Sequence, residues 1–139
     1  MYYTTELLAV LASVAIGAAL LTLLVAVRRR PVRARLTADG FQELEILVKG
    51  RYTPDAIEVR RGIPVRLRFR REEDVPCSER VIFSDFQVGC RLPAHKITPV
   101  CFIPNECGEF LFTCEFGMYQ GRLLVVEPTE IDLAKLERR

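Results

Sequence analysis

Two different hydrophobic patterns divide this chain. Residues 7–27 form an uncharged run rich in Leu, Ala and Val, which is long enough to cross the hydrocarbon core of a bilayer as one helix. No basic residue precedes the run and several arginines follow it at once, so the pattern favours an uncleaved anchor over a cleavable signal peptide. Beyond the arginines, apolar and polar residues alternate with a period of two, which is typical of strands.

The alternation is clearest in residues 65–70, where three apolar residues alternate with three arginines. Such a strand buries one face and leaves the other in water, so these arginines are expected to form a solvated face. Similar segments, separated by turn residues, predict seven short strands, at 43–48, 57–59, 65–70, 80–83, 97–103, 108–114 and 121–127. Residues 84–96 are expected to form an irregular connection. The pattern indicates an all-β fold, an antiparallel Greek-key sandwich or barrel.

Three regions follow from these patterns. Residues 1–35 are a transmembrane anchor with a basic juxtamembrane linker, and residues 36–128 have the size of one sandwich domain. Residues 129–139 are expected to form a short C-terminal helix or tail. Thr129 is a suitable N-cap for that helix, with Asp132 at the third helical position, as in a capping box.

Charge limits the kinds of partner. The region after residue 35 has fifteen Lys and Arg against seventeen Asp and Glu, so no basic surface for nucleic acid is predicted. The juxtamembrane arginines are better suited to anionic lipid head groups. By the positive-inside rule these arginines predict that the domain faces the cytoplasm. The chain has five cysteines, an odd number that cannot all pair within one molecule, which agrees with a reducing compartment. An extracytoplasmic domain remains the alternative.

The candidate chemistry lies in residues 108–121. Cys114 is expected at the end of a strand, and Met118 follows four residues later across a turn that contains Gly117. Thiolate and thioether sulfurs are soft donors that suit copper, Cu(I) above all. Ordinary core packing is the competing interpretation, because Cys and Met also fill cores.

Several segments together resemble a cupredoxin domain. The resemblance covers roughly residues 44–127 and is carried by Tyr-Thr-Pro at 52–54, Ile-Glu-Val-Arg-Arg-Gly at 57–62, Leu-Pro at 92–93, and the segment from Gly108 through Cys114 and Met118 to Gly121. More narrowly, the chain is similar to a membrane-anchored, plastocyanin-like subgroup that has Pro-Cys-Ser-Glu, here residues 76–79, in place of the first His ligand. The resemblance implies a mononuclear copper site at one end of a β-sandwich. Cys77 would come from the loop before one strand, and Cys114 and Met118 from the loop between the last two.

The chain departs from blue-copper proteins in its ligands. A blue-copper centre needs two His, and this chain has one, His95, far in sequence from both motif segments. The remaining set is Cys77, Cys114 and Met118, with Glu79 as a candidate fourth ligand. Two thiolates and a thioether favour one Cu(I) ion, so the predicted function is to hold Cu(I) or hand it over, with a copper-transporting or copper-accepting membrane protein as partner.

Three other functions stay open at this point. Glu79 as a ligand would favour Cu(II) and electron transfer through an atypical site. A metal-free sandwich could act as a membrane-bound interaction module, and reversible pairing of Cys77 with Cys114 would make a thiol redox sensor. An enzyme is not predicted, because His95 has no evident orienting partner and no phosphate-binding or zinc-hydrolase motif occurs.

The other three cysteines are not expected to join the site. Cys107 lies in the turn that precedes the strand ending at Cys114, about a strand length away. Cys101, in the middle of a strand, is expected to be a buried small hydrophobe. Cys90 lies in the long connection, where a disulfide to a neighbouring cysteine is conceivable if the domain faces outward. The closely spaced cysteine pairs of structural zinc sites are absent.

Overall fold

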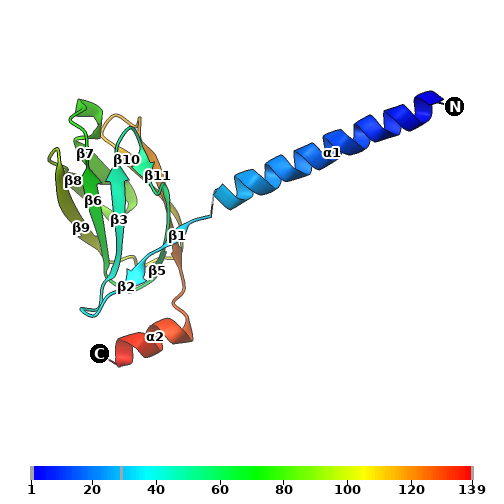
Figure 1. Ribbon diagram of the computed structural model, residues 1–139. Helices are drawn as coiled ribbons and strands as arrows, with labels where there is room; N and C mark the ends of the chain where they lie inside the picture. The colour runs from blue at the N-terminus through cyan, green and yellow to red at the C-terminus, as the bar shows by residue number, and fades with distance from the viewer. Residues whose placement is uncertain (1, 29, 139) are drawn as a thin grey trace. The chain divides into compact units, whose positions relative to one another are not determined.

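The computed structural model describes residues 2–28 and 30–138, which belong to two compact units divided between residues 30 and 31. The first unit is a single helix, α1 (Tyr2–Arg28). Its apolar part, Tyr2–Val27, is 26 residues long with a mean hydropathy of 2.6, enough to cross a membrane. The predicted N-terminal apolar helix is therefore present (Figure 1).

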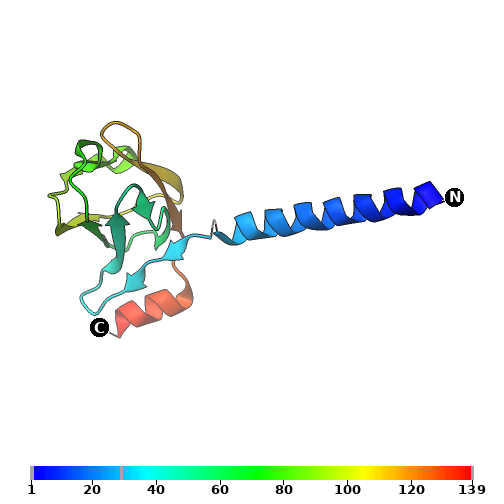
Figure 2. The same cartoon turned by 45° about the horizontal axis from the view of Figure 1, so that its top comes forward.

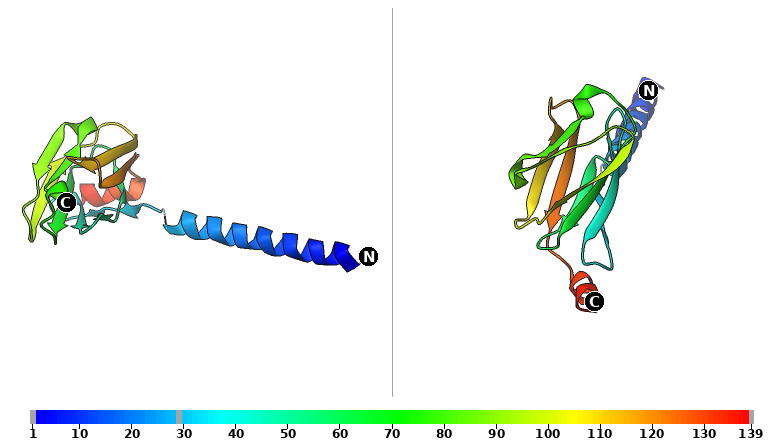
Figure 3. Two further views of the ribbon diagram at one scale, coloured as in Figure 1. Left: turned by 90° about the horizontal axis from the view of Figure 1, so that it is seen from above. Right: turned by 90° about the vertical axis from the view of Figure 1, so that its left-hand side faces the viewer.

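The second unit is a β-sandwich, whose two sheets form separate layers in Figures 1 and 3. The six-stranded sheet has the order β1-β5-β11-β10-β7-β8, and the five-stranded sheet has the order β2-β3-β6-β9, with β4 paired to β3. In the first sheet the strands are β1 (Val32–Arg33), β5 (Ala56–Arg60), β7 (Arg80–Phe83), β8 (Val88–Arg91), β10 (Gly108–Cys114) and β11 (Gln120–Val126). In the second they are β2 (Arg35–Leu36), β3 (Gln42–Val48), β4 (Tyr52–Thr53), β6 (Val65–Arg71) and β9 (Lys96–Phe102).

Aromatic rings from both sheets meet in the core. Phe69 on β6 lies 6.2 Å, between ring centroids, from both Phe83 on β7 and Phe112 on β10. Phe83 and Phe112 stack at 5.0 Å within their own sheet. Each of these rings occupies an apolar position of the predicted alternation, so the pattern identifies the buried face correctly.

All seven predicted strands are present, as β3, β5, β6, β7, β9, β10 and β11. Their pairing is mixed, whereas the sequence predicts antiparallel pairing. Strand β5 pairs in parallel with β11, and β3 pairs in parallel with β6. These partners are not joined by a hairpin, so the short turns that enforce antiparallel pairing do not constrain them.

Arg66, Arg68 and Arg70 on β6 point outward, as predicted, and pair with carboxylates, whereas Arg71 at the end of the strand is buried. Arg66 lies 3.1 Å from Glu43, and Arg70 lies 2.9 Å from Glu45. The acidic partners come mainly from β3, whose residues lie beside those of β6 in register. These side chains are partly exposed to solvent, which screens their charges, so each pair contributes little to stability.

Two segments have more regular structure than the sequence analysis expects. Residues 84–96 include a 3-10 turn, η2 (Ser84–Phe86), and the strand β8, which pairs with β7. Residues 32–36, at the junction of the expected linker and domain, form β1 and β2, with Ala34 buried between them. In β1, β2 and β8 small or apolar residues alternate with Arg or Gly. These alternations are too short to identify a strand from the sequence without knowing which strands lie beside it.

The C-terminal helix α2 (Glu130–Glu137) lies beside β1 and β2 in Figures 1 and 2. Thr129 and Asp132 form the predicted capping box. Asp132 is buried, and its Oδ2 atom lies 3.1 Å from both Arg33 Nη2 and Arg60 Nε. The Nε hydrogen of buried Arg60 is not aligned for a hydrogen bond, so this contact is an ion pair only. One carboxylate thus caps the helix and ties it to the sandwich.

This ion pair predicts a pH-dependent attachment of α2. Burial would raise the pKa of Asp132, but hydrogen bonds from Thr129 and the charges of Arg60 and Arg33 outweigh it and lower the pKa below its ordinary 3.8. The stabilisation is therefore complete above about pH 4 and is lost as the pH falls through the lower folded-state value. We expect Asp132→Asn to lower the free energy of unfolding by about 2 kcal/mol at pH 7.

The measurement is denaturant unfolding of the full chain in detergent, followed by near-ultraviolet circular dichroism. The difference between wild type and Asp132→Asn should narrow below about pH 4, because protonation removes the same charge. Glu130→Gln, on the exposed part of the same helix, is the control. An equal difference at pH 7 and pH 3 would contradict this role.

Candidate metal centre

Cys114 ends strand β10 and is 1% exposed. The chain then folds back through a tight turn, in which the Gly117 N–H donates to the Cys114 carbonyl and Gly117 has a φ of +70°. The Tyr119 N–H donates to the Cys114 Sγ atom at 3.2 Å. The turn therefore aims a backbone donor at the sulfur, and such a donor stabilises negative charge on it.

Cys77 reaches the same end of the sandwich from another segment. It lies in the 3-10 turn η1 (Pro76–Ser78), directly before β7. Strand β7 pairs with β10, and Val81 lies opposite Cys114. The half-buried Cys77 thiol interacts with the Tyr119 hydroxyl, while Tyr119 also donates its N–H to Cys114. Tyr119 thus hydrogen-bonds to one thiol and interacts electrostatically with the other.

Buried Arg71 holds the turn that carries Cys77. From the end of β6, its guanidinium donates to the Ser78 hydroxyl at 3.1 Å, the Leu92 carbonyl at 2.8 Å and the Val75 carbonyl at 2.7 Å. Two of these partners flank Cys77. One buried side chain therefore fixes the turn against the body of the sandwich.

Met118 lies in the turn between Cys114 and Tyr119, and its side chain is 73% exposed. Its neighbour Phe116 is exposed as well. The thioether is therefore on the same loop as the buried thiol but accessible from solvent.

The candidate fourth ligand and the single His are placed differently. An oxygen of the Glu79 carboxylate lies 2.7 Å from Arg91 Nη2, in an ion pair. His95 is exposed, with a φ of +57°, directly before β9. Across residues 2–28 and 30–138, no three His, Cys, Asp or Glu side chains gather as a metal site. A three-ligand centre around Cys77 and Cys114 therefore needs the Met118 thioether.

Sequence analysis missed the polar groups behind the thiols. Glu73 accepts hydrogen bonds from the Tyr119 hydroxyl at 2.9 Å and the Gly50 N–H at 2.7 Å. Burial would raise the pKa of Glu73, but bonds from Ser78, Gly50 and Tyr119 and the charge of Arg71 lower it, so the group remains a carboxylate. In the sequence Glu73 is simply one of three successive acidic residues, which carry no signal of this role.

Tyr52 is the second such residue. It is 1% exposed on β4, and its ring packs edge-on against Tyr119 at 5.7 Å between centroids. Its hydroxyl is buried and has no hydrogen-bond partner. A buried polar atom without a partner is unusual, because most buried polar groups in proteins are paired.

The donor set agrees with the chemistry of Cu(I). Two thiols and a thioether are soft ligands, and soft ligands select Cu(I) over hard cations. No imidazole from the chain's single His is placed beside them. The blue-copper arrangement of two His, a Cys and a Met is therefore not formed.

All five cysteines are free thiols, so the conceivable disulfide of Cys90 is not formed. Cys107 is exposed in the turn before β10, about a strand length from Cys114, as predicted, and its Sγ atom lies 3.3 Å from Glu127. Cys101 is exposed, which corrects the expectation that it is buried. On β9 its neighbours Val100 and Phe102 face the core, so the alternation turns Cys101 outward.

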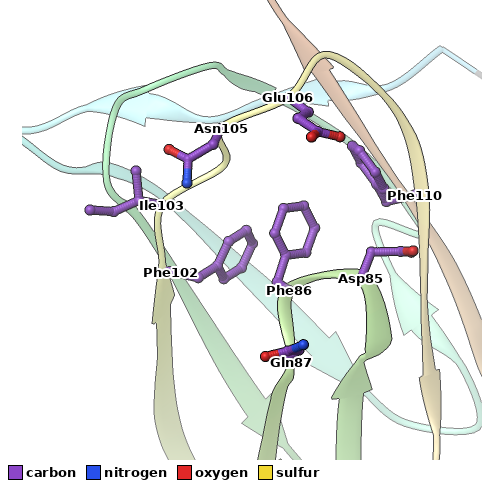
Figure 4. Close-up of a pocket in the computed structure, with 8 residues that line it drawn as sticks. All are labelled: Asp85, Phe86, Gln87, Phe102, Ile103, Asn105, Glu106 and Phe110. Atoms are coloured by element: carbon purple, nitrogen blue, oxygen red, sulfur yellow. The ribbon is translucent and has the colours of Figure 1, made fainter.

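A separate pocket of about 360 Å³ lies toward the opposite end of β10. Figure 4 shows the rings of Phe86, Phe102 and Phe110 around it, with Asp85 and Glu106 at its rim. Its lining contains no sulfur atom, so it is not part of the thiol site.

Comparison with known proteins identifies the fold. A metal-binding domain of the Cu(I)-exporting P-type ATPase CopA from Streptococcus pneumoniae D39, solved with Cu(I), is 27% identical with a TM-score of 0.69, over 71% of this chain and 98% of that one. A copper-binding protein solved by NMR in its apo form is 33% identical with a TM-score of 0.66, over 70% of this chain and 99% of that one. A search of curated proteins finds no match. The model of the cupredoxin-like domain family matches residues 13–125, and the chain therefore belongs to the cupredoxin-like family.

Proposed function

We propose that this protein is a membrane-anchored copper carrier that holds one Cu(I) ion through Cys77, Cys114 and Met118 and hands it to another protein. The observation that carries the proposal is the position of Tyr119, on the loop that also bears the thioether: its N–H donates to the Cys114 sulfur, and its hydroxyl interacts electrostatically with Cys77. The likeness to two copper-binding domains supports it.

The graded exposure of the three sulfurs suits transfer. Cys114 is buried, Cys77 is half-buried and Met118 is exposed. An incoming thiolate from a partner would replace the exposed, neutral thioether first and the half-buried thiolate next. The buried thiolate would leave last, so the ion is never without a sulfur ligand during the exchange.

Electron transfer is the weaker alternative. A site with two thiolates and no imidazole favours Cu(I) strongly, and oxidation to Cu(II) would expose the metal to reduction by its own ligands. The Glu79 carboxylate, which would stabilise Cu(II), is engaged by Arg91. The groups around the thiols give an enzymatic role no support, since the carboxylate behind them, Glu73, is engaged by Tyr119 and Gly50.

The partner we propose is a copper-transporting membrane protein. The similar domain from Streptococcus pneumoniae belongs to a Cu(I)-exporting ATPase. Helix α1 would keep this chain in the same bilayer as such a transporter, and basic residues such as Arg30 and Arg35 would contact anionic lipid on the cytoplasmic side.

The test is a Cu(I) titration of the full chain in detergent, without oxygen, against a chromophoric chelator. We expect one ion per chain, and affinity at least about tenfold lower in Cys77→Ser, Cys114→Ser and Met118→Leu, because each removes a soft ligand. Cys101→Ser and Cys107→Ser remove exposed thiols elsewhere and are the matched controls. Unchanged affinity in any of the three ligand variants would remove that residue from the site, and no uptake by wild type would reject the function.

A further inference from the structure

The buried hydroxyl of Tyr52 has no function in the fold. The ring fills the core between Phe69, at 5.9 Å between centroids, and Phe112, at 5.1 Å, and a Phe ring would fill the same space. The hydroxyl has no hydrogen-bond partner, so it weakens the fold relative to a carbon-bound hydrogen. A ligand or a second state of the site is needed to explain why the chain has Tyr here.

Tyr52 adjoins the candidate metal centre. The Tyr52 ring packs edge-on against Tyr119 at 5.7 Å between centroids, and the Tyr119 N–H donates to the Cys114 sulfur at 3.2 Å. Burial is the main cause that raises the pKa of Tyr52, and negative charge on Cys114, Tyr119 and Cys77 raises this pKa further. The phenol therefore keeps its proton and can donate a hydrogen bond.

We propose that Tyr52 is a positioning residue for the copper site, whose hydroxyl donates a hydrogen bond to a cysteine sulfur when that sulfur becomes a metal-bound thiolate. This inference rests on the proposed function. A neutral thiol is a weak acceptor, whereas a thiolate accepts strongly and from more than one donor. Cys114 already accepts from the Tyr119 N–H on one side, and Tyr52 would donate from the core side.

Convergence of the two sulfurs on one ion supplies the missing acceptor. Each thiol releases its proton to solvent when it binds the metal, and the negative sulfur is then drawn toward the buried donor. Tyr52 would thus favour the loaded protein over the metal-free one. Outer donors of this kind typically change metal affinity by about 10–100-fold.

The decisive variant is Tyr52→Phe in the full chain in detergent, because two measurements are expected to move in opposite directions. The denaturant midpoint of the metal-free protein should stay the same or rise, since an unsatisfied hydroxyl is removed. The affinity for Cu(I), measured against the chelator, should fall about tenfold. Tyr119→Phe is the contrast, because it breaks the bond to Glu73 and should lower the metal-free midpoint.

Each other outcome overturns the inference. A lower midpoint in metal-free Tyr52→Phe would mean that the hydroxyl stabilises the fold by itself. Cu(I) affinity within twofold of wild type would mean that it does not act on the sulfurs. Failure of the wild-type protein to bind Cu(I) would reject both this inference and the proposed function. If the wild-type protein binds Cu(I) and Tyr52→Phe binds it with the same affinity, only this inference is rejected.

Discussion

Arg71→Met is expected to lower the free energy of unfolding by about 3 kcal/mol, although Met has a similar length and suits a buried position. The guanidinium donates to three groups from one buried site, and Met donates to none. In this variant the carbonyl of buried Leu92 loses its Arg71 donor. The Val75 carbonyl keeps two donors from Ser78, the hydroxyl at 3.1 Å and the backbone N–H at 3.2 Å.

Arg70→Met is the matched control, since Arg70 is the preceding residue on the same strand and faces solvent. Its partners Glu45 and Glu72 are themselves exposed, so its loss should cost less than about 1 kcal/mol. Denaturant unfolding of both variants in detergent, followed by near-ultraviolet circular dichroism, gives the comparison. Equal effects at the two positions would show that the buried hydrogen bonds of Arg71 are not the cause.

The same variant should also impair Cu(I) binding. Arg71 fixes the turn η1 on both sides of Cys77, so without it the thiol loses its fixed position relative to Cys114. We therefore expect weaker Cu(I) uptake by Arg71→Met even under conditions where the sandwich remains folded. Uptake equal to wild type would mean that the turn holds its shape through Pro76 and its neighbours alone.

Much of the fold follows from local patterns. Strand β6, with Leu67 and Phe69, is predictable because the alternation specifies one buried face. Helix α1 is predictable because its apolar run is long enough to cross a bilayer. Strands β1, β2, β4 and β8 are not predictable in this way, since each has only two to four residues. Strand β1 also has a distant partner, β5, whereas β2 and β4 pair with the neighbouring strand β3 and β8 pairs with the neighbouring strand β7. For these last three, the shortness of the segment alone conceals the strand.

The site shows the same division. Cys114 and Met118 lie on one turn, so their proximity can be predicted from spacing, and the family resemblance adds Cys77. Glu73 and Tyr52 come from segments that no spacing links to the thiols. Their roles follow from tertiary packing, in which Tyr119 contacts Glu73, Cys77 and the ring of Tyr52.

Gly121 determines how the two ends of the metal loop pair. It lies opposite Phe112 in the register of β10 and β11, and the Phe112 ring lies over its Cα atom. A Cβ atom at Gly121 would clash with the Phe112 Cζ atom, far inside van der Waals contact. The ring has no space to retreat, because it is packed against Phe83 at 5.0 Å and Tyr52 at 5.1 Å between centroids.

Gly121→Ala is therefore expected to lower the free energy of unfolding by about 3 kcal/mol, the upper range for overpacking of a core. Gly89→Ala in β8 is the control, since the nearest atom to its Cβ would be the mobile Arg80 Nη2 at 3.6 Å. Phe112→Leu combined with Gly121→Ala should be less destabilising than the sum of the two changes, because the smaller side chain admits the methyl group. Additive effects in this double-mutant cycle would show that the ring is not what excludes a side chain from position 121. Because Phe112 and Gly121 flank Cys114 and Tyr119 at a distance of two residues, the overpacked strands should also displace the turn that presents the Tyr119 N–H to the Cys114 sulfur.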